Sequence, residues 1–72
     1  MSEQMNDPDW PTRIALCTNK AEATEIYAEA IRSDARNEGQ PVVWRTLNAA
    51  IIERWSESAL RDVKRDAWKA VA

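Results

Sequence analysis

The sequence predicts an all-α protein, a small bundle of three main helices, with a short fourth helix at the N-terminus left open. Apolar residues recur at spacings of three and four, which is the helical period. No segment alternates apolar and polar residues as a strand does, and the 72 residues include a single glycine. Capping and stop signals divide the chain into helix-length segments. We expect one helical domain over residues 9–72, with helices at about 20–37, 42–55 and 57–71.

Residues 1–8 are polar, contain Pro8 and show no periodicity, so they are expected to form a disordered leader. They lack the basic and apolar regions of a secretion signal, which favours a cytoplasmic protein. Asp9 can cap a helix and Pro11 is tolerated in a first turn, so residues 11–17 are the place for the short fourth helix.

The segment 20–37 carries its apolar residues on one small-residue-rich face, which another helix can approach closely. Asn19 and Glu22 suit its beginning, and Gly39 supplies a left-handed stop. Asp34 falls inside the apolar face at 100° per residue. A charge buried there must be paired, so we expect an ion pair with Arg45 or Arg54.

Ser56 is the predicted N-cap that separates the last two helices. Their apolar stripes should form the core of the bundle. The residues predicted to be largely buried there are Trp44, Leu47, Ile51, Trp55, Leu60 and Val63, packed against Ile26, Tyr27 and Ala30.

Ile52 widens the apolar arc of the middle helix beyond one packing seam, since it lies about 100° from Ile51. An arc this wide needs cover on two sides. The second cover is either another subunit or the N-terminal segment folded back, with Trp10, Ile14 and Leu16. Both alternatives stay open.

The composition excludes several kinds of site. The chain has no histidine and one cysteine, Cys17, so a zinc site built from thiolate and imidazole ligands is excluded and no internal disulfide can form. We expect Cys17 to be a small buried apolar residue. No phosphate loop, nucleophile elbow or metal motif is present. We therefore expect no catalytic residue, no metal, no cofactor and no membrane span.

A basic stripe follows the last helix. Arg61, Arg65 and Lys69 recur every four residues, with Lys64 and Trp68 beside them, and such a face can contact phosphate and stack a base. Two acids run parallel to the stripe, however, and would repel phosphate. The sequence pI of about 5.0 is also low for a DNA-binding domain. The competing interpretation is a solvated helix face with the ion pairs Asp62–Arg65 and Asp66–Lys69.

A chain of this length buries only about 60% of its unfolded surface, so partner binding is a natural source of stability. Residues 1–40 carry a net charge of −4 and residues 41–72 carry +2, so the two halves can attract each other within or between chains. We predict a protein–protein interaction module, such as an adaptor, inhibitor or regulatory subunit, that binds itself as a homodimer or another protein. The partner-binding residues would be Ile52, Trp10 and Trp68. The alternative is a nucleic-acid-binding regulator that uses Arg61, Lys64, Arg65 and Lys69.

Overall fold

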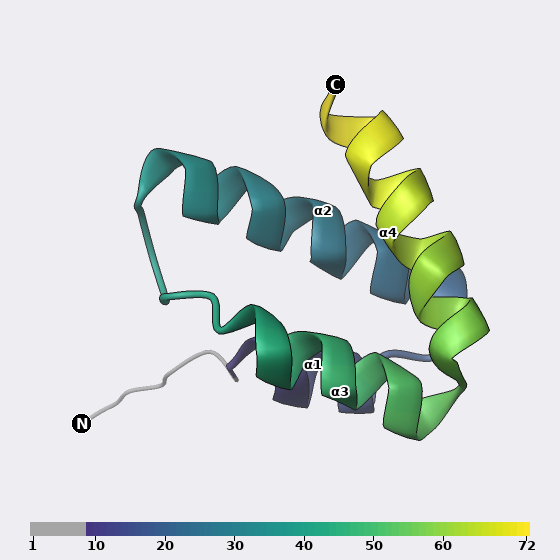
Figure 1. Cartoon of the computed structure of the whole chain (residues 1–72). Helices are drawn as coiled ribbons and strands as arrows, with labels where there is room; N and C mark the ends of the chain where they lie inside the picture. The colour runs from purple at the N-terminus through teal and green to yellow at the C-terminus, as the bar shows by residue number, and fades with distance from the viewer. Residues whose placement is uncertain (1–8) are drawn as a thin grey trace.

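The computed structural model describes residues 9–72, and these form four helices and no strand (Figure 1). The predicted all-α fold is confirmed, and the short fourth helix is present. The segment predicted as a leader lies outside the described residues. The helices are α1 (Trp10–Leu16), α2 (Lys20–Arg36), α3 (Trp44–Arg54) and α4 (Glu57–Val71).

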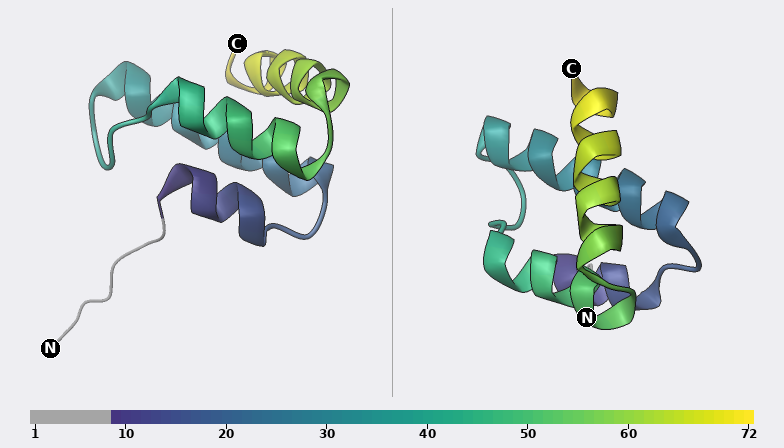
Figure 2. Two further views of the ribbon diagram at one scale, coloured as in Figure 1. Left: turned by 60° about the horizontal axis from the view of Figure 1, so that its bottom comes forward. Right: turned by 45° about the vertical axis from the view of Figure 1, so that its right-hand side comes forward.

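The helices pack as two main pairs. α1 lies along α3, and α4 lies across α2 (Figures 1 and 2). α3 and α4 meet at the Ser56 junction and diverge from it, so an angle opens between them on one side of the molecule (Figure 2). This arrangement places the later residues of α3 next to the first turns of α4.

Three helices begin at the side-chain caps that the sequence predicts. Asp9 accepts a hydrogen bond from the backbone N–H of Thr12, at 3.0 Å. Asn19 accepts one from Glu22, and Ser56 accepts one from Ala59. Each cap satisfies a backbone donor that has no partner within its helix.

The C-terminal end of α2 and the start of α3 differ from the prediction. The left-handed residue that closes α2 is Asn37, with a φ of 56°, and Gly39 follows with a φ of 68°. Asparagine tolerates this region better than other non-glycine residues, so it can serve as the C-cap. α3 begins at Trp44: Val42 and Val43 lie outside the helix, the backbone of Val43 is extended, and no side chain caps the helix.

The core lies where the four helices converge. Ile14 of α1, Leu47 and Ile51 of α3 and Val63 of α4 are its largest fully buried side chains. α2 adds buried alanines and Tyr27, and small side chains on both α2 and α4 let those two helices approach closely. α1 therefore supplies part of the core although it has only seven residues.

Three of the six residues predicted to be largely buried are only half-buried: Trp44, Trp55 and Leu60. Trp55 follows the end of α3 as its C-cap, and its ring lies against the guanidinium of Arg54, 4.6 Å from the ring centroid. Its indole therefore rests at the edge of the core. Leu60 lies about 100° around α4 from the inward residue Ala59, which places it at the border of the α4 packing face.

The prediction for Asp34 is wrong. Asp34 is exposed, and within residues 9–72 it forms no ion pair with Arg45 or Arg54. Positions 34–37 are all exposed, because the last turn of α2 extends beyond the helices that cover its middle (Figure 1). Asp34 does lie on the packing face of α2, as periodicity predicts. In the last turn of the helix, however, no other helix of residues 9–72 packs against that face.

We expect Ile51→Ala to lower the free energy of unfolding by about 2–5 kcal/mol, since it empties a fully buried site. In a domain this small that loss is a large part of the total stability. Trp55→Ala should cost less than Ile51→Ala, because the Trp55 indole is half-buried. Urea denaturation followed by circular dichroism measures both. A larger loss for Trp55→Ala would show that the indole carries more of the core than its burial indicates.

Candidate functional site

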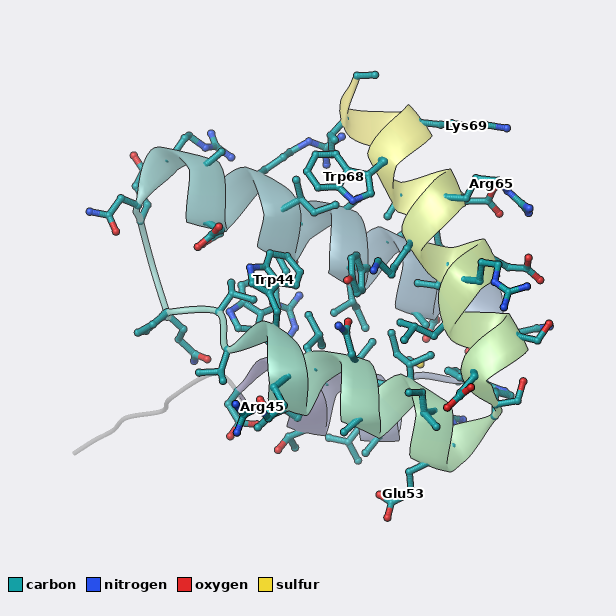
Figure 3. All side chains as sticks on the ribbon, in the orientation of Figure 1. Trp44, Arg45, Glu53, Arg65, Trp68 and Lys69 are labelled. Atoms are coloured by element: carbon teal, nitrogen blue, oxygen red, sulfur yellow. The ribbon has the colours of Figure 1, made fainter. Side chains whose placement is uncertain are left out.

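A candidate binding surface lies where α3 meets α4. Ile52 of α3 and Leu60 of α4 line a shallow open groove there, together with Glu57, Arg61 and Lys64. Trp68 lies one turn beyond Lys64 on the same side of α4 and is 54% exposed. We call Ile52, Leu60 and Trp68 the α3–α4 surface. In Figure 3, Trp68 extends from α4 toward the angle between the two helices.

Helical spacing explains why these residues lie at the edge of the core. On α4, Ala59, Val63 and Ala67 point inward at intervals of four. The stripe made by Leu60, Lys64 and Trp68 is displaced by one residue, or about 100°, and so lies beside the packed face. Ile52 has the same relation to Ile51 on α3. The junction at Ser56 brings these two secondary stripes together in one groove.

Among the described residues, α1 does not cover Ile52. Residues of α1, among them Ala15 and Leu16, instead adjoin Ala50, Glu53 and Arg54 of α3. The fold-back alternative is therefore confirmed in part: α1 packs against α3 and buries Trp10 and Ile14, but it does so on the side of α3 away from Ile52. Ile52 is half-buried and lines the groove together with Leu60.

Trp10 is removed from the candidate binding residues. Its side chain is only 6% exposed and packs in the core. The indole Nε1 donates a hydrogen bond to the carbonyl oxygen of Gln40 at 3.2 Å. The Arg13 guanidinium lies over the ring, 4.6 Å from its centroid. Trp10 therefore joins α1 to the segment before α3 and does not present its ring to a partner.

The four predicted basic residues, Arg61, Lys64, Arg65 and Lys69, are all exposed on α4. Arg65 pairs with Asp62 at 3.4 Å, which confirms that predicted ion pair. Asp66 pairs with Arg65 at 3.3 Å, so the predicted partner Lys69 is wrong. Figure 3 shows Arg65 and Lys69 on the outer side of α4, away from Trp68.

Charge compensation therefore differs between the two sides of α4. Arg65 has two carboxylates beside it. Within residues 9–72, Arg61, Lys64 and Lys69 belong to no ion pair. Two of these uncompensated cations, Arg61 and Lys64, line the groove next to Ile52 and Leu60. The groove thus combines an apolar centre with cations that are available to a partner.

Arg54 has a structural role that the sequence did not indicate. Its Nη1 donates to the carbonyl oxygen of Ile14 at 2.8 Å and lies 3.1 Å from the Sγ of Cys17. Ile14 is in the last turn of α1, so Arg54 satisfies a carbonyl that α1 cannot. Cys17 is buried, as predicted, and its thiol donates to the same carbonyl at 3.1 Å. No local pattern links positions 14 and 54.

Two kinds of site are not found in the described part of the chain. No group of three or more histidine, cysteine, aspartate or glutamate residues among positions 9–72 is arranged to hold a metal ion. None of the helices formed by these residues is long and apolar enough to cross a membrane.

The ring of Tyr27 packs against the ring of Trp44. The two rings lie 5.3 Å apart, centroid to centroid, and the Tyr27 hydroxyl donates to Asn48 Oδ1 at 2.9 Å. Burial raises the pKa of the Tyr27 phenol above its usual value of 10.0. The folded state thus favours the neutral phenol more than the unfolded state does.

We expect this difference to make the wild type less stable at alkaline pH. The contribution of the neutral phenol is fully present below about pH 10, the pKa of an unfolded tyrosine, and is lost as the pH rises through the folded value. Tyr27→Phe should be less stable at neutral pH but should lack this part of the alkaline loss. Urea denaturation of both proteins across this range measures it. Parallel losses of stability in the two proteins would show that Tyr27 does not contribute.

No protein-family model matches this chain, and neither the curated proteins nor the solved structures include a significant match to it.

Proposed function

We propose that this chain is a small protein–protein interaction module, an adaptor, inhibitor or regulatory subunit, that binds through the α3–α4 surface. The observation that carries the proposal is Trp68, whose large indole is more than half exposed on a regular helix. Tryptophan is among the residues that contribute most to protein interfaces. When a partner buries this indole, the burial would supply a large share of the binding free energy, because the surface is small.

The surroundings of Trp68 support the proposal. Leu16 and Val43 are also exposed, at 69% and 57%, but neither lines the groove. Trp68 is different, because Lys64 links it along the helix to the groove that Ile52 and Leu60 line. An apolar centre with a charged rim is the usual organisation of a protein interface. Exposed apolar residues that are scattered singly have no such meaning.

Binding suits the chemistry of this surface better than catalysis. The ionisable groups in the groove, Glu57, Arg61 and Lys64, are exposed. The single thiol, on Cys17, is buried beneath Arg54 and is not part of the groove. We also propose a cytoplasmic location, since reducing conditions keep an unpaired thiol free. A partner would add stability to a domain with a small core by mass action.

We expect the double variant Ile52→Asn with Trp68→Ser to lose association with protein partners, whether a second copy or another protein, while it keeps its helical content. Both side chains lie at the edge of the core, so the fold should tolerate the change. Leu16→Ser is the matched control, because it removes an exposed apolar side chain from α1, outside the α3–α4 surface. Chemical cross-linking and pull-down with the full chain compare the three proteins. Equal association by all three would contradict the proposal.

The alternative function, a nucleic-acid-binding regulator, is favoured by the charges of Arg61 and Lys64, which belong to no ion pair of the described residues. Asp62 and Asp66 on the same helix oppose it, and Arg65 is occupied by both. We therefore expect no measurable binding to duplex DNA at physiological salt, as read by fluorescence anisotropy. Tight binding that weakens with salt, with a log–log slope of about 0.9 per phosphate contact, would favour the alternative. If such DNA binding is then lost when Arg61, Lys64, Arg65 and Lys69 are changed to glutamate, these four residues form the DNA-binding site.

A further inference from the structure

We propose that the occupant of the α3–α4 surface is a second copy of this chain, docked with its α4 antiparallel to the first across a two-fold axis near Leu60. The inference rests on the proposed function and names the partner. It follows from the order of charges along α4, the lack of partners for those charges within the described chain, and the position of the apolar residues beside them.

The charges along the groove complement themselves. Glu57, Leu60 and Lys64 follow one another at intervals of three and four, so an acid, an apolar residue and a base lie in that order along one side of α4. An antiparallel copy presents the reverse order. A two-fold axis that passes between positions 60 and 61 places each Glu57 opposite Lys64 of the other copy. A closed dimer of this kind uses the same patch twice.

These charges have no partner within residues 9–72. Neither Glu57 nor Lys64 belongs to an ion pair there, and two helical turns separate them, about 10 Å along the axis. Glu57 also makes no ion pair with Arg61, which lies four residues later. On the outer side of α4 the charges are arranged differently, because Arg65 is already paired with Asp62 and Asp66. Within residues 9–72, the groove side of α4 keeps both an acid and two bases outside any ion pair, whereas on the outer side only Lys69 is left outside one.

The apolar residues fit the same arrangement. Leu60 lies on the flank of the charged stripe that faces α3, next to Ile52. A two-fold axis at this point brings the Leu60 side chains of the two copies together and places each Ile52 beside them. Arg61 lies on the opposite flank of the stripe, toward solvent, where it can reach Glu57 of the second copy. The pairing thus removes Ile52 and Leu60 from water and neutralises both acids.

A charge-reversal cycle tests the dimer. The molar mass of the full chain is measured by light scattering and sedimentation velocity at micromolar to submillimolar concentrations. We expect the wild type to dimerise. Glu57→Lys and Lys64→Glu should each weaken the dimer by about tenfold or more, because like charges then face each other. The double variant Glu57→Lys with Lys64→Glu restores the opposition of acid and base and should dimerise again.

Lys69→Glu is the matched control. It makes the same charge change as Lys64→Glu on the same helix, on the outer side and outside any ion pair of the described residues, so the dimer should persist. Circular dichroism confirms that each variant is folded before its mass is interpreted. Dissociation by Lys69→Glu, or failure of the double variant to restore the dimer, would overturn the antiparallel pairing.

The inference and the proposed function fail in different ways. A wild type that is monomeric at all these concentrations, yet loses another protein on Ile52→Asn with Trp68→Ser, overturns only the second copy as occupant. If the wild type is monomeric and also binds no other protein, both the dimer and the proposed function are contradicted. Salt-sensitive DNA binding that depends on Arg61 and Lys64 would assign those charges to phosphate and would also overturn the dimer.

Discussion

The close contact between α2 and α4 is the packing on which the other features of the fold depend. Both helices bury alanines at this contact, among them Ala30 and Ala67, so their backbones approach closely and leave little space for larger side chains. The larger side chains of Leu60 and Trp68 lie beside this buried face of α4, which holds Val63 but no larger apolar residue. Leu60 and Trp68 remain near the surface for this reason, and the candidate binding surface is a by-product of the same packing that stabilises the domain.

Local signals in the sequence predicted the helices well. Asp9, Asn19 and Ser56 cap helices through hydrogen bonds that span three residues, so short-range patterns contain the information needed to find them. The fold class follows from the same period and caps. The start of α3 was harder to place, because no side chain caps it.

Features that depend on the position of a second helix could not be predicted in this way. Asp34 lies on the apolar face of α2, but nothing covers that turn, and Trp10 reaches a carbonyl thirty residues later in the chain. Within the candidate site, helical periodicity indicates Ile52 as a surplus apolar residue and places Trp68 beside the basic stripe of α4. Periodicity assigns Leu60 to the core and gives no reason to place Glu57 beside Ile52, because their meeting in one groove depends on the angle between α3 and α4.

The bond from Arg54 to the end of α1 also bears on the order in which the chain becomes structured. A seven-residue helix is too short to persist alone in water. Its Ile14 carbonyl is satisfied by a guanidinium that follows forty residues later. During synthesis α1 leaves the ribosome before α3 and thus waits for it before it can dock, so α1 reaches its final conformation only after a segment that is made later.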